Sequence, residues 1–179
     1  MKKYELTEET FTVFGKTLYR IRAVRDFGSV KTGEFGGYIE KEENLSHFGD
    51  AWVYGDARVS ENAWVYGDAR VSGDARVYDN AWVYGNAKVY GNAWVYGNAE
   101  VFNTRHFFVQ GPIGSRDGYV TFYRTKDDTI GVRCGCFSGS LQEFVNQVEE
   151  THGGSRYEKE YKLAAELAKV CIRLEGESR

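Results

Sequence analysis

The side chains that could do acid–base chemistry are few in this sequence. It has three histidines, His47, His106 and His152, and an imidazole titrates near enough to neutral pH to serve as a general base. His106 is the one plausible base, and a structural role is the preferred interpretation of all three. The sequence contains no nucleophile elbow, no paired-carboxylate arrangement and no P-loop.

A glycine-rich loop over residues 111–118 is the second place where chemistry could occur. Its backbone N–H groups and an arginine could together hold a phosphate or another anion, although the loop lacks the Lys-Ser/Thr ending of a P-loop. The preferred interpretation is that the loop only connects two strands, and the anion site is the alternative. The residues expected at an anion or nucleotide-type site are Gly114, Ser115, Arg116, Arg124, Lys126 and Arg133.

The three cysteines offer a weaker possibility. Cys134 and Cys136 could form a four-ligand zinc set with His152 and Cys171, but only one residue separates the first two cysteines, which is fewer than in usual zinc pairs. Their spacing instead places both on one face of a strand, where they would pack. We therefore expect no metal and no cofactor.

Composition and charge limit the possible partners and location. The net charge of -3 gives no general attraction to nucleic acid or to anionic membranes, and no apolar run is long enough to span a membrane. The first ten residues lack the apolar stretch of a signal peptide. An odd number of cysteines without an export signal favours reduced thiols and a cytoplasmic location.

An internal repeat determines the elements that position these residues. Nine consecutive hexapeptides read GDAWVY, GDARVS, ENAWVY, GDARVS, GDARVY, DNAWVY, GNAKVY, GNAWVY and GNAEVF. Alanine and valine are two apart, so they point to the same side of a strand, and the preceding Gly-Asp or Gly-Asn pair marks a turn. Three hexapeptides predict one triangular coil with alanine and valine inside, and the nine copies predict about three coils.

An irregular earlier copy, residues 44–47, keeps the six-residue phase. It places His47 at a valine position, where the ring would point inward or lie in a frayed first coil. The remaining histidines also lie outside the nine regular hexapeptides, and no insertion interrupts them.

A period of 18 residues sorts the outward side chains onto three walls. The first wall carries Trp52/Tyr54, Arg70/Ser72 and Lys88/Tyr90; the second carries Arg58/Ser60, Arg76/Tyr78 and Trp94/Tyr96; the third carries Trp64/Tyr66, Trp82/Tyr84 and Glu100/Phe102. We call the five aromatic residues of the third wall, Trp64, Tyr66, Trp82, Tyr84 and Phe102, the aromatic wall. It could stabilise the sheet by cross-strand contact or dock a partner. The second interpretation is favoured, because the basic residues lie on the other two walls.

The pattern of residues 83–88, Val-Tyr-Gly-Asn-Ala-Lys, resembles the hexapeptide repeat of left-handed β-helix proteins. The resemblance covers residues 44–102 and implies the left hand of the coil, which the period alone does not give. With the Gly-Gly-Tyr-Ile lead-in at residues 36–39, the chain is similar to uncharacterised hexapeptide-repeat proteins of bacteria and their phages, often labelled acetyltransferases. The same resemblance implies a trimer, and for the enzymes of the class a histidine beside the coil as general base.

The flanks of the repeat differ from it and from each other. Residues 1–43 read as a β-hairpin cap, with strands at 11–14 and 17–24 around a turn at Gly15-Lys16, which would cover the unpaired edge of the first coil. Residues 103–179 read as a small α+β domain with strands at 107–110, 119–123 and 130–134. Two helices follow, each opened by a capping box at Ser140 or Ser155, with Gly153-Gly154 ending the first and the second running toward Leu174. The expected fold is therefore mainly β, a left-handed parallel β-helix between these two flanks.

The expected function is that of a non-catalytic binding or scaffold protein. It would self-associate, with a trimer favoured, or dock a partner through the aromatic wall, and the α+β domain would bind a ligand. Similarity to small phage-encoded proteins adds a sharper hypothesis: an inhibitor of host defence that blocks a host protein or sequesters a nucleotide signal at residues 114–116. The alternative is an acyltransferase that uses acetyl-coenzyme A, with His106 as the base.

Overall fold

The computed structural model describes residues 1–175 of the chain. They divide into two compact units, Met1–Thr104 and a second unit that begins at Arg105. Each unit has a core of its own. No helix within the described residues is long and apolar enough to cross a membrane.

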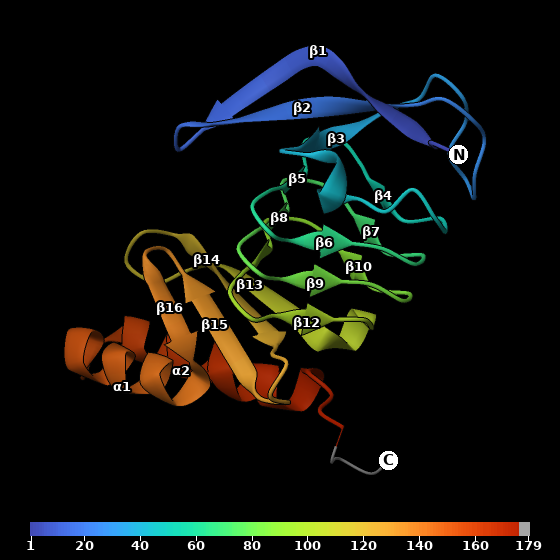
Figure 1. The fold of residues 1–179 in the computed structure, drawn as a ribbon. Coiled ribbons are helices and arrows are strands. Elements are labelled where there is room, and N and C mark those ends of the chain that lie inside the picture. Colours follow the sequence, from blue (N-terminus) through green and yellow to red (C-terminus); the bar gives the residue numbers. More distant parts are fainter. Residues whose placement is uncertain (176–179) are drawn as a thin grey trace. The chain divides into compact units, whose positions relative to one another are not determined.

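The repeats of the first unit form a β-solenoid (Figure 1). Nine two-residue strands stack into three parallel ladders, so that three strands make one turn. The ladders are β4 (Trp52–Val53), β7 (Arg70–Val71) and β10 (Lys88–Val89); β5 (Arg58–Val59), β8 (Arg76–Val77) and β11 (Trp94–Val95); and β6 (Trp64–Val65), β9 (Trp82–Val83) and β12 (Glu100–Val101). Every alanine and valine of the repeat is at most 1% exposed. The predicted interior is confirmed, and the register confirms which outward residues stack above one another. Trp52 of the first wall is nevertheless fully buried, because Tyr4 and Phe27 pack against its ring.

The solenoid has about four turns rather than the three predicted, because N-terminal segments extend two of its ladders. Strand β3 (Phe35–Ile39) pairs in parallel with β5, and Leu45 forms a parallel bridge with Val65. Leu45 therefore takes the inward valine position that the phase assigned to His47. The histidine instead stacks on the ring of Tyr4, with 4.3 Å between ring centroids.

The turn of the N-terminal hairpin lies one residue earlier in the sequence than predicted. Strands β1 (Tyr4–Val13) and β2 (Lys16–Ala23) are antiparallel, and the turn between them is Phe14-Gly15. Both turn residues have positive φ, 49° and 76°, as a type I′ hairpin turn requires. Strand β2 also pairs with β3, so the hairpin extends the sheet that contains β5, β8 and β11.

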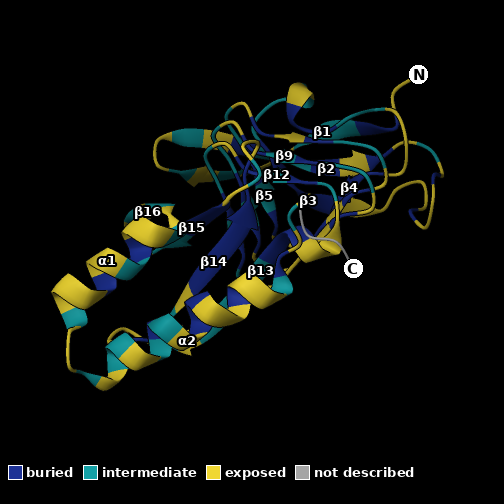
Figure 2. Ribbon diagram, turned by 90° about the horizontal axis from the view of Figure 1, so that it is seen from below, coloured by how far each residue is buried: buried dark blue, intermediate teal, exposed yellow. Residues whose placement is uncertain are grey.

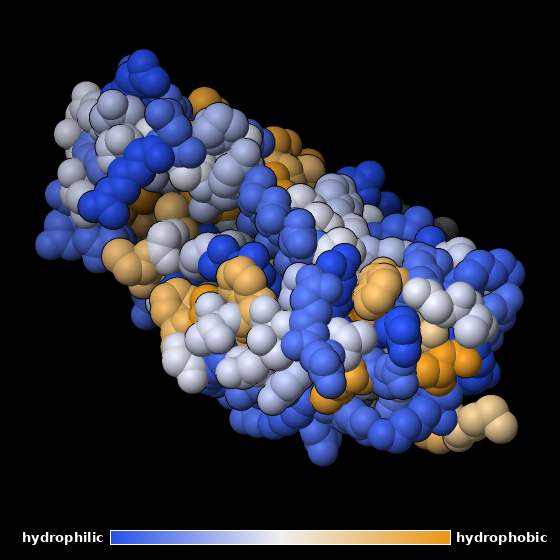
Figure 3. Space-filling model, turned by 90° about the horizontal axis from the view of Figure 1, so that it is seen from above, coloured by the Kyte–Doolittle hydropathy of each residue, from blue (hydrophilic) through white to orange (hydrophobic). Residues whose placement is uncertain are grey.

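Three kinds of donor cover the backbone carbonyls of the first coil, whose strands have no coil before them. On the β5 ladder the backbone of β3 does so, with the Tyr38 N–H donating to the Ala57 carbonyl at 2.9 Å. Next to β6, the Asn44 side chain at the end of a 3-10 turn (η1, Glu42–Asn44) donates to the carbonyls of Glu61 and Ala63. Next to β4, the buried Lys3 ammonium donates to Gly49 and Ala51. Figure 3 views the molecule from the side of these N-terminal strands, where hydrophobic residues lie in small groups between hydrophilic ones.

The second unit follows a short 3-10 turn (η2, Thr104–His106) and contains a four-stranded antiparallel sheet with two helices. The elements are β13 (Phe107–Ile113), β14 (Gly118–Arg124), β15 (Ile130–Cys134), β16 (Phe137–Ser140), α1 (Leu141–His152) and α2 (Arg156–Cys171). Strand β16 was not predicted, because Phe-Ser-Gly-Ser has no alternating apolar pattern. The predicted capping box at Ser140 is confirmed, with the Ser140 side chain accepting the Glu143 N–H and the Glu143 side chain accepting the Ser140 N–H. Ser155 caps α2 by accepting the Glu158 N–H, but the Glu158 carboxylate accepts the N–H of Gly154, so the second capping box is not formed.

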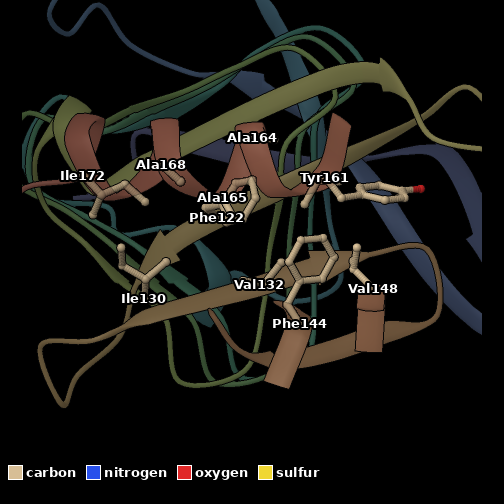
Figure 4. Packing of buried hydrophobic residues seen from close by; sticks show 11 residues of the cluster. Phe122, Ile130, Val132, Phe144, Val148, Tyr161, Ala164, Ala165, Ala168 and Ile172 are labelled. Carbon is tan, nitrogen blue, oxygen red and sulfur yellow. The ribbon is translucent and has the colours of Figure 1, made fainter. Parts of the chain in front are cut away.

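Aromatic rings from three elements meet in the core of the second unit (Figure 4). The ring of Phe144 on α1 makes edge-to-face contacts with Phe122 on β14 and with Tyr161 on α2, at centroid distances of 5.8 and 5.7 Å. Strand β14 is dark blue over most of its length in Figure 2, and both helices show yellow outer sides. Phe144 thus joins the sheet to both helices.

Candidate binding sites

The five residues of the aromatic wall lie together on the ladder of β6, β9 and β12, as the period of 18 requires. The Trp64 and Trp82 rings are 6.2 Å apart and nearly perpendicular. The rings of Tyr66 and Tyr84 are stacked at 4.7 Å with 3° between their planes. Tyr84 and Phe102 continue the column at 5.2 Å. Each ring therefore has a fixed neighbour in the next coil, which stabilises the solenoid and sets the ring orientations.

The aromatic wall differs in exposure along its length. Trp64, in the first of its three strands, is 39% exposed and also stacks on Tyr66 at 4.1 Å, whereas the other four residues are half-buried. Burial raises the pKa of Tyr66. The Tyr84 hydroxyl donates to the Glu100 carboxylate at 2.8 Å. Together these side chains present a rigid surface with a large ring at one end.

The glycine-rich loop connects β13 to β14, as its preferred interpretation has it, and packing explains its glycine. Gly114 begins the turn between β13 and β14, and its N–H donates to the Glu160 carboxylate at 2.7 Å. A Cβ at this position would lie 1.9 Å from the Tyr161 hydroxyl, so the packing of Tyr161 requires glycine. A carboxylate of α2 already accepts the N–H that was expected to hold an anion. Ser115 and Arg116 are exposed beside it.

The six predicted anion-site residues do not form one site. Arg124 is the last residue of β14 and Lys126 follows the strand, whereas residues 114–116 precede it. The length of β14 therefore separates the two groups by roughly 20 Å. Arg124 is buried and forms ion pairs with Asp128 at 2.8 Å and Glu175 at 3.3 Å. Arg133 lies in β15 and donates to the backbone carbonyls of residues 136 and 137. The sequence places all six residues in one domain but does not show that the length of β14 separates residues 114–116 from Arg124 and Lys126.

All three histidines lie in packed surroundings. His47 accepts a hydrogen bond from the Lys3 N–H at 3.3 Å, and burial lowers its pKa. His106 is 6% exposed. His152, at the end of α1, lies 5.6 Å from the ring of Tyr161. The one candidate base is thus a buried imidazole.

The cysteines are free, and only one of the predicted pair is in a strand. Cys134 ends β15, while Cys136 lies in the following turn and is exposed. Burial raises the pKa of the Cys134 thiol. Within residues 1–175 no three His, Cys, Asp or Glu side chains are grouped closely enough to hold a metal ion.

Comparison with known proteins bears on the solenoid alone. Residues 51–67, 69–85 and 81–97 match the model of the YdcK β-solenoid repeat. Over these residues the chain is similar to the YdcK β-solenoid repeat. No curated protein matches the chain. The matched stretches contain Trp64, Tyr66, Trp82 and Tyr84 of the aromatic wall, but neither Phe102 nor the second unit.

The sequence analysis missed a pair of side chains in the solenoid repeats as a candidate site. Arg58 and Arg76 occupy the same position in successive coils, and their guanidinium carbons lie over the rings of Phe11, at 3.9 Å, and Trp94, at 4.7 Å. The period of 18 already places these arginines above one another on the second wall. The contact of Arg58 with Phe11 of the N-terminal hairpin is one that the period cannot reveal.

Proposed function

We propose that this protein is a non-catalytic scaffold that associates with copies of itself through the aromatic wall, with a trimer as the expected assembly. The observation that carries the proposal is the exposed ring of Trp64 at the end of a stacked aromatic column. Tryptophan and tyrosine are enriched in protein interfaces. Because stacking already fixes these rings, docking would cost little side-chain entropy.

The packed surroundings of the histidines support a binding role over a catalytic one. A general base has to reach the proton that it abstracts, and His106, the only candidate, is buried. The acyltransferase alternative therefore has less support. Turnover of acetyl-coenzyme A that is abolished by His106→Ala would restore it.

The resemblance to hexapeptide-repeat proteins adds two finer proposals, a left-handed coil and a role as a phage-type inhibitor of host defence. An experimental structure would test the first directly. For the second, blocking a host protein has more support than sequestering a nucleotide at residues 114–116, because Glu160 already accepts the Gly114 N–H.

Light scattering tests the assembly. The wild-type protein is expected to have three times the 20.4 kDa mass of one chain, and Trp64→Glu is expected to reduce the assembly to monomers, because it places a charge where the apolar ring would be buried. Tyr90→Glu is the matched control, since Tyr90 is an exposed aromatic residue on another wall, and its mass should equal that of the wild type. A monomeric wild type, or a Trp64→Glu variant with unchanged mass, would overturn the proposal.

A further inference from the structure

The ladder of β3, β5, β8 and β11 carries two arginines directly above one another. Arg58 and Arg76 are register partners in parallel strands, so their backbones lie about 4.8 Å apart. Tyr38 precedes them in the column and Trp94 follows them. The Arg58 guanidinium also lies 3.9 Å from the ring centroid of Phe11. Two like charges are thus held side by side between aromatic rings.

In the part of the chain that the structure describes, neither guanidinium has an acidic partner. Within residues 1–175 no ion pair involves Arg58 or Arg76, whereas Arg20 and Arg22 of the neighbouring hairpin are paired with Glu9 and Glu5. The Nε atoms of Arg58 and Arg76 are buried without a hydrogen-bond partner. Burial and then the charge of Arg58 lower the pKa of Arg76, and the nearby Tyr78 and Asp74 only partly offset this.

This arrangement is unfavourable for a protein without a ligand. Two partly buried positive charges in adjacent coils repel one another more strongly than they would in water, and each buried N–H without an acceptor adds a desolvation penalty. A bound anion would remove the repulsion between the two charges. Of the three guanidinium nitrogens in each described side chain, only Nε is buried without a partner. The two terminal nitrogens can therefore be reached from solvent.

The geometry points to a phosphate group as that anion, and we propose that Arg58 and Arg76 together bind inorganic phosphate or a phosphate monoester. A guanidinium donates two parallel N–H bonds to a pair of oxygens. A phosphate has enough terminal oxygens to engage two guanidinium groups at once, whereas a carboxylate has only two and is satisfied by one. The Phe11 and Trp94 rings exclude water from one side of each arginine and so strengthen the electrostatic attraction. The site does not depend on the aromatic wall.

The neighbouring wall supplies a matched control. Arg70 and Lys88 are also register partners in successive coils, but both are exposed, so water and salt screen their repulsion. The variant Arg58→Gln/Arg76→Gln and the control Arg70→Gln/Lys88→Gln remove the same charge from the same kind of position. Only the first pair is expected to affect phosphate binding.

Calorimetry at low ionic strength tests the site with inorganic phosphate, adenosine monophosphate and acetate as probes. The wild type and the control are expected to bind inorganic phosphate at one site per chain with a dissociation constant of about 1 mM or tighter, while Arg58→Gln/Arg76→Gln weakens binding at least about tenfold. Acetate is expected to bind at least about tenfold more weakly than phosphate. Tighter binding of the nucleotide than of phosphate would identify a monoester as the ligand, and the reverse order would identify the free anion; both support the site.

Thermal unfolding followed by tryptophan fluorescence provides a second measurement that does not rely on affinity. Without phosphate, Arg58→Gln/Arg76→Gln should unfold at the same or a higher temperature than the wild type, because the repulsion is gone. Phosphate should raise the unfolding temperature of the wild type and the control but not that of this variant. Equal stabilisation of all three proteins by phosphate, or no phosphate binding to the wild type, would overturn the proposal.

Discussion

The two units of this protein build their cores in different ways. In the solenoid the interior repeats one alanine and one valine per strand, and each coil contacts only the coils before and after it. In the second unit the core depends on single, unrepeated rings such as Phe144, which joins the sheet to both helices. A solenoid therefore transmits a defect from coil to coil, whereas the second unit depends on a few residues that cannot substitute for one another.

The sequence provides a separate probe for each unit. All four tryptophans, at positions 52, 64, 82 and 94, lie in the solenoid, and both α-helices lie in the second unit. Tryptophan fluorescence therefore reports unfolding of the first unit, and the helical signal in far-ultraviolet circular dichroism reports unfolding of the second. The two signals together show which unit a substitution destabilises.

The largest effect is expected from a charge inside the solenoid. Ala69 is fully buried in a central coil, and Ala69→Asp would place a carboxylate there without a partner, at a cost of about 5 kcal/mol. The fluorescence transition should be lost while the helical signal persists. Arg70→Asp is the control, because Arg70 is the next residue and points outward. Loss of both signals in Ala69→Asp would show that the two units unfold as one.

The reverse experiment removes a ring from the second unit. Phe144→Ala deletes contacts with Phe122 and Tyr161 and leaves a cavity, so it should lower the free energy of unfolding by about 4 kcal/mol. The helical signal should disappear at a lower denaturant concentration, with the fluorescence transition unchanged. Leu163→Ala, on the exposed side of α2, should have little effect on either signal. A Phe144→Ala variant as stable as Leu163→Ala would contradict this account of the core.

A smaller loss of stability is expected when the cap of the first coil is removed, because the later coils need no such cap. The Asn44 amide donates to the carbonyls of Glu61 and Ala63, which no preceding coil can satisfy. Asn44→Ala should therefore cost about 2 kcal/mol, measured by denaturation with fluorescence detection. Asn62→Ala removes an exposed amide from a nearby corner and should cost less than about 0.5 kcal/mol. Equal costs for the two variants would mean that Asn44 does not cap the ladder.

The regular repeats could be interpreted from the sequence because a fixed period determines which residues become neighbours. It predicts that Trp64 lies above Trp82 and Arg58 above Arg76, and the register confirms both. The period does not predict which residues before the regular repeats point inward at the first coil. There Leu45, rather than His47, points inward, because the segment before the regular repeats is longer than the phase allows.

The candidate sites show the same limit. The period places the five aromatic residues on one wall, whereas the predicted anion site rested on composition alone. Gly114 is required by Tyr161 and its N–H is held by Glu160, residues more than forty positions later in the sequence. Local composition cannot reveal a neighbour that only the folded α2 helix supplies. Likewise, the pairing of β16 with β15 depends on the sheet rather than on the Phe-Ser-Gly-Ser sequence.

The smallest change for each step of the measurement is expected in a pH dependence, which arises at the capped end of the solenoid and not in its aliphatic interior. Burial lowers the pKa of Lys3 from 10.5 to about 8, so the folded protein releases this proton at a lower pH than the unfolded chain does. The free energy of unfolding should therefore rise between pH 8 and 10.5, by at most about 1.4 kcal/mol per pH unit.

Burial raises the pKa of the neighbouring Tyr4 above its usual value of 10.0, so its contribution to stability is lost as the pH rises through and above 10, opposite in sign to that of Lys3. Measurements between pH 8 and 9.5 isolate the lysine. Lys3→Met should abolish the rise, because methionine has no proton to release, whereas Lys2→Met should retain it, because Lys2 is exposed. A rise that persists in Lys3→Met would mean that another group titrates between pH 8 and 9.5, and that the burial of the Lys3 ammonium against the carbonyls of Gly49 and Ala51 does not cause the pH dependence.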